Sequence, residues 1–215
     1  HSEKIVMKIE KNSNSNFSGH LNFGPNDGFL YISVGDENHH QAISSNSLDL
    51  TNFYGKVLRI DVNKDYPYSI PNDNPFLDDF YKRAEIFCYG LQNPRRFSFD
   101  KITNDLLIAD ISKNSWQEIN WNTWENSKKA NFGWNITEGN HCADQEAFCD
   151  TSGLIMPIYK YPSRVSYIQK FMNMGKNGTY GCEIIGGYIY RGYKHDSLYG
   201  SYIFGDFCSN QIWVL

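Results

Sequence analysis

The stretch Tyr31–Asp36, YISVGD, returns in related form as LLIAD at Leu106–Asp110 and as YIFGD at Tyr202–Asp206. Each copy is a short apolar strand that ends in a small residue and an aspartate, after a turn-rich segment. A strand that recurs in this way is typical of a blade repeat, in which equivalent strands lie at the same radius of a ring. Three unrelated strand-to-loop exits would look the same, and this pattern alone leaves that alternative open.

The rest of the chain also reads as β-structure. Aromatic residues make up 16% of the sequence, which suits pleated, half-buried surfaces. The candidate strands are Lys4–Lys8, Phe29–Val34, Lys56–Asp61, Ile86–Tyr89, Arg96–Phe99, Leu106–Asp110, Glu118–Asn122, Gly187–Arg191, Tyr202–Gly205 and Gln211–Leu215. Only Leu77–Ala84 is predicted to form a helical turn or two. Many short strands separated by Gly, Pro and Asn turns favour a sandwich, a barrel or a propeller, and the aspartate repeat favours the propeller.

The composition limits the classes of partner and the size of the domain. With 40% hydrophobic and 20% charged residues the chain is globular, and its net charge of −4 argues against nucleic acid as a main partner. No apolar run is long enough to span a membrane. The chain opens at His1 rather than at a methionine, so we expect a processed product or a fragment. At about 40–50 residues per blade, residues 1–215 make about four to five blades of a single, partial domain.

Cysteine usage points to an oxidising compartment. The five cysteines leave at least one unpaired within the chain. Cys142 and Cys149 bracket a short polar loop and predict a small disulfide-closed loop. The alternative is a metal site that includes His141, but the spacing provides no fourth ligand. A disulfide here predicts a periplasmic or extracellular protein.

Eight motifs in order carry a resemblance to a known family. They are SGHLNFGPNDGFLYISVGDENHHQ (18–41), GKVLRIDVN (55–63), YSIPNDNPF (68–76), YGLQNPRRFSFD (89–100), ADISKNSWQEIN (109–120), NFGWNITEGNHC (131–142), IIGGYIYRG (184–192) and LYGSYIFGDFCSNQIWVL (198–215). The chain resembles the glucose/sorbosone dehydrogenase family, which includes soluble pyrroloquinoline-quinone (PQQ) sugar dehydrogenases and the propeller of hedgehog-interacting proteins. The resemblance runs from about Asn16 to Leu215. It implies an all-β, six-bladed β-propeller with the active site at one mouth of the central channel, with PQQ and calcium as cofactors.

The resemblance also implies disulfides. Comparison with bacterial members of the family suggests the pairs Cys142–Cys149 and Cys182–Cys208. Cys88 is then left free.

The catalytic positions that the resemblance implies are altered. The family histidine that takes the proton from the sugar hydroxyl aligns with Asn16, and a carboxamide cannot act as a general base near neutral pH. His20 is four residues further on, and we expect it to lie on the surface or to line the channel. Asp36 falls where the family has an aspartate that supports the base and contacts substrate, although a turn aspartate would also suit that position. Gln41 falls on another family site residue.

The cofactor positions are altered as well. Asn93 matches a quinone-contacting asparagine, but Gln92 replaces an arginine that pairs with the acid groups of the quinone. That loss removes a bidentate, charge-assisted contact and should weaken the binding of an anionic cofactor. The family calcium is held partly by two backbone carbonyls, which here belong to Ser112 and Lys113. A lysine ammonium beside a cation is unfavourable unless its stem carries it away.

Two functions follow from these positions. The first is a PQQ-dependent sugar dehydrogenase that oxidises a hydroxyl of an aldose, glucose or sorbosone by hydride transfer to the quinone. The second is a non-catalytic secreted propeller that binds a glycan or a protein. A structural propeller with an unrelated ligand is a third, blander alternative. A catalytic protein must supply a base near Asp36, and this requirement separates the first function from the others.

Overall fold

The computed structural model describes residues 3–10, 19–36, 46–112, 116–144, 148–163 and 181–215. Thirteen strands are described, together with one four-residue α-helix and one 3-10 turn. The strands are β1 (Leu21–Phe23), β2 (Leu30–Val34), β3 (Lys56–Ile60), β4 (Ile86–Tyr89), β5 (Pro94–Phe99), β6 (Leu106–Asp110), β7 (Trp116–Asn122), β8 (Thr137–Glu138), β9 (His141–Cys142), β10 (Tyr159–Pro162), β11 (Ile184–Ile189), β12 (Tyr202–Asp206) and β13 (Ile212–Val214). The helix α1 is Trp124–Ser127, and the 3-10 turn η1 is Asp196–Leu198. No helix in these ranges is long and apolar enough to cross a membrane.

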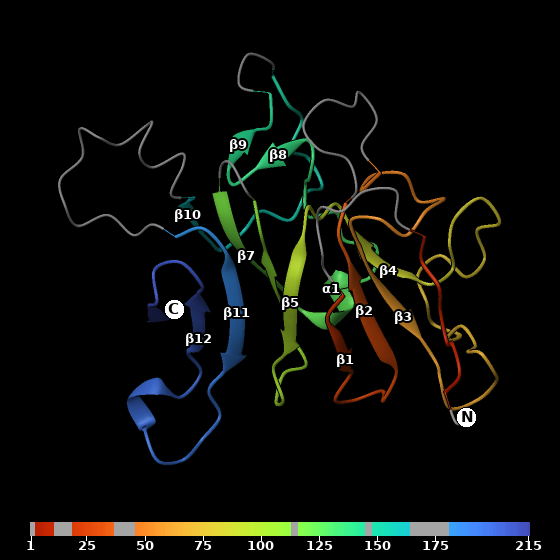
Figure 1. Ribbon diagram of the computed structural model, residues 1–215, viewed down its shortest axis with the longest axis horizontal. Helices are drawn as coiled ribbons and strands as arrows, with labels where there is room; N and C mark the ends of the chain where they lie inside the picture. The colour runs from red at the N-terminus through yellow and green to blue at the C-terminus, as the bar shows by residue number, and fades with distance from the viewer. Residues whose placement is uncertain (1–2, 11–18, 37–45, 113–115, 145–147, 164–180) are drawn as a thin grey trace.

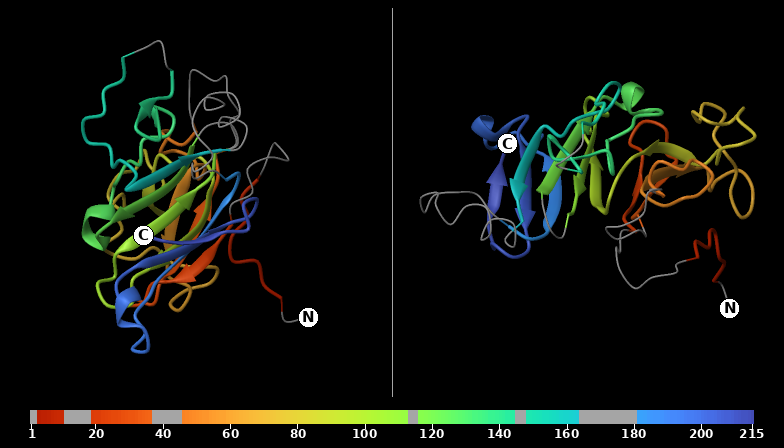
Figure 2. Two further views of the ribbon diagram at one scale, coloured as in Figure 1. Left: turned by 90° about the vertical axis from the view of Figure 1, so that its left-hand side faces the viewer. Right: turned by 90° about the horizontal axis from the view of Figure 1, so that it is seen from above.

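The strands form three antiparallel sheets that follow one another along the chain. Their strand orders are β1-β2-β3-β4, β5-β6-β7-β10 and β11-β12-β13, and β8 and β9 form a separate two-stranded ribbon. Figure 1 shows the first sheet in red-brown to yellow, the second in yellow-green to teal and the third in blue, in chain order across the molecule. Seen from above in Figure 2, the three sheets stand beside one another in succession across the molecule. This is the arrangement of consecutive propeller blades.

Two apolar cores hold neighbouring sheets together. Tyr31 and Phe87 of the first sheet pack with Phe97 and Ile108 of the second. On the opposite face of β6, Leu107 and its neighbours pack against the third sheet. All five residues of β6 are buried, because successive side chains of this strand enter different interfaces. This explains why LLIAD is an unbroken apolar run rather than an alternating one.

The three strands that carry the aspartate repeat occupy equivalent places. β2, β6 and β12 are each the second strand of their sheet, and Asp36, Asp110 and Asp206 are all buried at or just after the end of these strands. The blade-repeat interpretation of the sequence is therefore confirmed. The described residues form three blade-like sheets, and the expected count of four to five is not confirmed. Long connections, such as the one from Ile60 at the end of β3 to Ile86 at the start of β4, increase the number of residues that each sheet uses.

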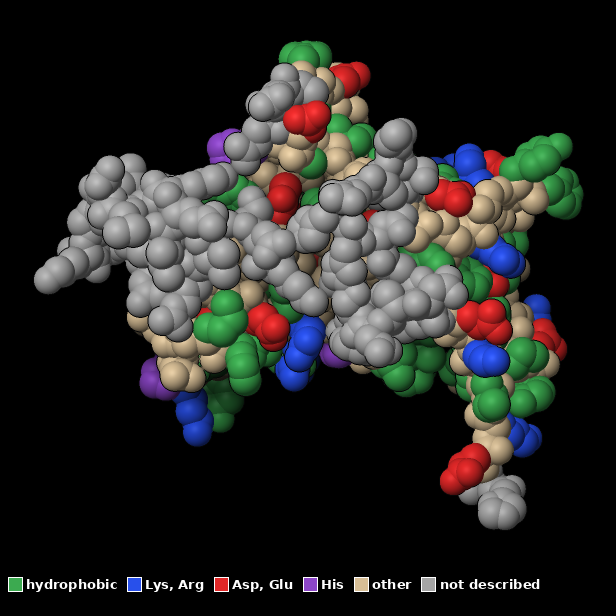
Figure 3. Space-filling model, turned by 45° about the horizontal axis from the view of Figure 1, so that its top comes forward, with side chains coloured by type: hydrophobic (Ala, Val, Ile, Leu, Met, Phe, Trp, Pro, Cys, Tyr) green, Lys and Arg blue, Asp and Glu red, His purple; other side chains and the backbone are tan. Residues whose placement is uncertain are grey.

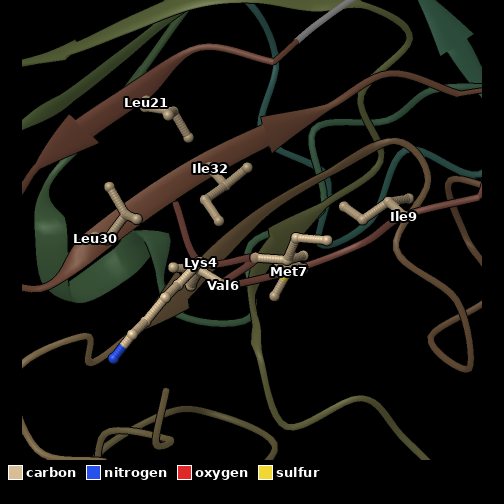
Figure 4. A pocket seen from close by; sticks show the side chains of 8 residues that line it. Lys4, Val6, Met7, Ile9, Leu21, Leu30 and Ile32 are labelled. Carbon is tan, nitrogen blue, oxygen red and sulfur yellow. The ribbon is translucent and has the colours of Figure 1, made fainter. Parts of the chain in front are cut away.

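Most candidate strands are confirmed to within two or three residues at their ends. Two expectations were wrong. Leu77–Ala84 forms turns rather than a helix. Lys4–Lys8 is not a strand, because its backbone joins no ladder; Met7 packs against the core of the first sheet, whereas Ile5 and Val6 are exposed. Figure 4 shows Met7 and Ile9 across from Leu30 and Ile32, beside a groove of about 600 Å³.

The cysteines are paired as the resemblance implied. Disulfides join Cys142 to Cys149 and Cys182 to Cys208, and Cys88 is a buried free thiol. The alternative of a metal site at Cys142 is wrong, because its sulfur is in the disulfide. His141 contacts the indole of Trp116 instead, with the ring centroids 5.3 Å apart.

Candidate functional site

The candidate site is built around Asp110 at the end of β6. Its carboxylate accepts hydrogen bonds from the backbone N–H groups of Gln92 (2.8 Å) and Asn93 (2.6 Å), which come just before β5. The carbonyl of Gln92 in turn accepts a hydrogen bond of 2.7 Å from the backbone N–H of Asp36. The predicted site residues Asp36, Gln92 and Asn93 therefore lie together, and Asp110 joins the loops that carry them.

Asp36 is held by an aromatic side chain from a distant segment. The indole N–H of Trp134 donates to the Asp36 carboxylate at 2.9 Å, and the carbonyl of Trp134 accepts a hydrogen bond of 2.7 Å from the Ser47 hydroxyl. Asp36 is 1% exposed. The interpretation of Asp36 as a simple turn cap is incomplete, because its side chain also binds the indole of Trp134 and so holds a second loop in place.

Lys56 lies in the same region, and its ammonium group is enclosed by protein oxygens. Its Nζ donates to the backbone carbonyls of Asn46 (2.8 Å) and Tyr54 (2.6 Å). Burial lowers the pKa of Lys56 to about 7, whereas Asp36 and Asp49 act to raise it. The carbonyls favour the charged form, so Lys56 holds the loop between β2 and β3 rather than offering a free amine.

His20 is not placed to replace the missing base. Its Nδ1 accepts a hydrogen bond of 3.3 Å from the backbone N–H of Phe97, and its ring meets the Phe97 ring edge to face at 4.9 Å. Burial and the charge of Arg96 lower the pKa of His20. The neutral side chain joins the first two sheets, so the expectation that it is a surface or channel-lining residue is only partly met.

The backbone carbonyl proposed for calcium already has a protein partner. Ser112 is buried, its carbonyl accepts a short hydrogen bond from the Gln117 amide, and its hydroxyl donates to Glu138. Within the described ranges, the only group of three residues with metal-ligating atoms close together is Cys182, Asp206 and Cys208. Two of those atoms are the sulfurs of a disulfide. These donors do not fit a calcium ion at Ser112.

The residues around Gln92 and Asn93 also fit a quinone poorly. Gln92 has no charge to pair with an acid group, and the structure uses its backbone to bind Asp110 and Asp36. Asn93 is buried, and its side-chain oxygen has no hydrogen-bond partner. A buried acceptor without a partner, close to the Asp110 carboxylate, is an unfavourable neighbour for an anionic cofactor.

Asn16, Gln41 and Lys113 lie outside the described residues, so their predicted roles stay predictions. Sequence reasoning missed Trp134, Glu118 and Glu138 as residues of this region. All three lie in the quoted motifs, Trp134 and Glu138 in NFGWNITEGNHC and Glu118 in ADISKNSWQEIN, but the motifs assign them no role. Asp110 had been noticed only as a repeat position.

Two carboxyl groups face each other between β6 and β7. Asp110 and Glu118 are cross-strand partners in the ladder. Burial raises the pKa of Asp110 to about 7, with smaller contributions from Glu138 and Asp36. Burial, together with the Asp110 charge, raises the pKa of Glu118 to about 8. Like charges directly opposite each other on a sheet are destabilising, so this pair is most stable with protons bound.

These raised pKa values predict a loss of stability in mild alkali. The folded protein keeps protons that the unfolded chain releases near pH 4, so the stabilising contribution is complete below that pH. It is lost as the pH rises through about 7–8. We expect the free energy of unfolding, measured by urea titration, to fall by about 1–3 kcal/mol from pH 6 to pH 9.

Glu118→Gln tests the origin of this pH dependence. The amide oxygen can still accept from the Gly139 N–H but cannot ionise, so the loss of stability between pH 6 and 9 should become smaller. Glu125→Gln on the exposed face of α1 is the matched control and should leave the pH profile as it is. An unchanged profile in Glu118→Gln would show that Glu118 is not protonated in the folded protein at pH 6.

Comparison with known proteins places the chain among relatives of this architecture. A profile of the family described as "Glucose / Sorbosone dehydrogenase" matches residues 1–168. The HIPL2 protein of Arabidopsis thaliana is 32% identical over 93% of this chain, and the Hedgehog-interacting protein of Mus musculus is 30% identical over 94%. The chain spans only 29% and 25% of the lengths of these two relatives.

Solved structures agree on the fold. A structure titled glucose dehydrogenase superposes with a TM-score of 0.74 at 17% identity, over 99% of this chain and 54% of that one. The PQQ-bound aldose sugar dehydrogenase from Streptomyces coelicolor gives a TM-score of 0.54 at 22% identity, over 72% of this chain and 38% of that one. With the arrangement of the sheets, these matches confirm the predicted all-β propeller fold. The chain belongs to the glucose/sorbosone dehydrogenase family.

Proposed function

We propose that this chain is part of an extracellular propeller that binds a carbohydrate without oxidising it. The observation that carries the proposal is that Asp36, Asp110 and Lys56 are all engaged with other parts of the protein. Among the described residues of the site, none of these three is left to accept a proton from a bound hydroxyl. The predicted loss of the base at Asn16 and the neutral Gln92 support the same conclusion.

The extracellular location is part of this proposal. Two disulfides in one domain support an oxidising compartment. The names of the relatives give no direct location for this chain, so the disulfides carry this point.

The second candidate is a PQQ-dependent sugar dehydrogenase. Asp36 and Asn93, which match family site residues, lie together at the ends of neighbouring strands, and this observation favours an inherited catalytic site. In that case another side chain must act as the base, and the quinone must bind without the arginine that Gln92 replaces.

Titration of the calcium-loaded protein with PQQ separates the two candidates. We expect no saturable change in quinone absorbance at micromolar concentration and no dye reduction with aldoses, because the base and the quinone-pairing charge are both absent. The informative comparison is Asn16→His/Gln92→Arg, which should gain quinone binding if the family site is otherwise intact. Stoichiometric quinone binding with sugar-dependent dye reduction by the unmodified protein would overturn the proposal.

A further inference from the structure

Two adjacent arginines, Arg95 and Arg96, are exposed at the beginning of β5. Successive side chains of a regular strand point to opposite faces, so a pair of neighbours does not normally serve one site. The ladder between β5 and β6 is irregular at this point, with a register shift between Pro94 and Arg96. A bulge of this kind re-aims a side chain, and it lets both guanidinium groups reach the same space.

A second irregularity lies opposite the first, on β11. The β11–β12 ladder shifts register between Ile184 and Gly186. Gly186 has φ +79°, and a Cβ at this position would lie 2.9 Å from Cβ of Ala109 and 3.3 Å from Cβ of Arg96. Because Gly186 has no Cβ, β11 can approach β5 closely next to the two bulges.

The two bulges border a pocket of about 130 Å³ between the second and third sheets. Its described lining consists of Arg95, Arg96, Glu183, Ile184, Ile185 and Phe207. We name these six residues the anion pocket; Arg95 is two residues from Asn93 in the sequence. The volume of the pocket suits an acidic group with part of one small ring.

Among the described residues, the two guanidinium groups have none of the carboxylate partners that other arginines of this protein have. Arg59 pairs with Asp27 at 3.0 Å and with Asp73 at 2.7 Å, and Arg191 pairs with Asp100. In the described part of the chain no carboxylate lies within ion-pair distance of Arg95 or Arg96. On the face shown in Figure 3, charged side chains of both signs are scattered. Two arginines beside a pocket, with no ion pair to any described carboxylate, are therefore a local feature of a chain with a net charge of −4.

The other lining groups narrow the chemistry of the ligand. The planar fork of a guanidinium matches a carboxylate with two parallel hydrogen bonds. Glu183 can accept a hydroxyl hydrogen but repels a second acid group, so it favours a ligand with a single charge. Phe207 is 66% exposed and offers an apolar ring against which the C–H face of a sugar can pack.

We propose that the anion pocket binds the carboxylate of an acidic sugar. The inference rests on the proposed carbohydrate-binding function and names its ligand class. Arg95 and Arg96 hold the acid group, Glu183 accepts from a ring hydroxyl, and Phe207 covers one side of the ring.

Calorimetric titration of the intact protein with glucuronate and with glucose tests the proposal. Glucuronate should bind at least about 10-fold more tightly than glucose in low salt, because charge-assisted bidentate contacts are available only to the acid. This advantage should be lost in Arg95→Gln/Arg96→Gln and should shrink at high ionic strength. Lys101→Gln/Lys194→Gln, which removes the same charge from two exposed positions, is the matched control and should bind like the unmodified protein.

The comparisons with glucose, PQQ and sulfate identify the class of ligand responsible for any binding that depends on the two arginines. Equal affinities for glucuronate and glucose would overturn the inference while leaving the carbohydrate-binding function standing, whereas no binding of either sugar would count against both. Arginine-dependent binding of PQQ without glucuronate would assign the pocket to the acid groups of the quinone and overturn the inference. Displacement of glucuronate by an equal concentration of inorganic sulfate would show a general oxyanion site and overturn the sugar assignment. Thermal unfolding of each variant confirms that the fold is kept.

Discussion

Asp206→Ala should lower the free energy of unfolding by about 3–5 kcal/mol, measured by urea titration at neutral pH. The Asp206 carboxylate is buried and accepts from the Tyr161 hydroxyl at 2.8 Å. It also accepts from four backbone N–H groups, namely those of Cys182, Glu183, Cys208 and Ser209. Removing the acceptor leaves the buried Tyr161 hydroxyl and four partly buried N–H groups without their partner, and each loses hydrogen-bond free energy.

The comparison with two other variants identifies the cause. Asp206→Asn keeps one acceptor oxygen, so its destabilisation should be smaller than that of alanine. Asp196→Ala, on the exposed η1 turn, should change stability by less than about 0.5 kcal/mol. If Asp206→Ala lowered the free energy of unfolding no more than Asp196→Ala, the Cys182–Cys208 disulfide alone would be sufficient to join the segment before β11 to the segment after β12. The Asp206 carboxylate would then be dispensable.

The same arrangement explains why the aspartate repeat could be predicted from the sequence. Asp110 binds the two backbone N–H groups just before β5, and Asp206 binds those just before β11. In both sheets the aspartate at the end of the second strand therefore fixes the entry into the first strand. A local rule of this kind repeats with each blade, so it leaves a visible pattern in the sequence.

Contacts between distant segments left no such pattern. Trp134 reaches Asp36 across 98 residues, and neither residue's neighbours indicate the pairing. The anion pocket depends on two bulges in different sheets, and a bulge is an irregularity of pairing rather than of composition. Lys4–Lys8 is a short apolar run typical of a strand, but its backbone joins no ladder, and Met7 and the following Ile9 pack against the core of the first sheet.

Arg59→Ala should be the second strongly destabilising change, with an expected loss of about 3–4 kcal/mol in the free energy of unfolding. The Arg59 side chain is 1% exposed and joins Asp27 and Asp73 in ion pairs. Its guanidinium lies 4.7 Å from the ring centroid of Phe29 and 5.3 Å from that of Trp124. Because Trp124 belongs to α1, which follows β7 of the second sheet, Arg59 connects the first two blades.

Arg59→Met separates charge from packing. The methionine keeps much of the apolar stem, so this variant should recover part of the stability that alanine loses. Partial burial acts to raise the pKa of Asp73, but the hydrogen bond and charge of Arg59 outweigh it and lower that pKa. NMR titration should therefore show the Asp73 pKa rising in Arg59→Met. The ion pair stabilises the protein fully at a pH above the ordinary pKa of an aspartate. This stabilisation is lost as the pH falls through the lowered pKa of Asp73. Arg59→Ala and Arg59→Met lack the ion pair, so both should lose less stability than the unmodified protein on acidification.

Arg83→Ala is the matched control for Arg59, because it is an arginine of the same blade with an exposed side chain. It contacts the carbonyl of Thr51 and the ring of Phe53, and its replacement should cost less than about 1 kcal/mol. Equal losses for Arg59→Ala and Arg83→Ala would contradict the role of Arg59 as a connection between blades. A full loss in Arg59→Met with no change in the Asp73 pKa would contradict the ion pair itself, since the remaining interaction would then be only that of the guanidinium with the aromatic rings.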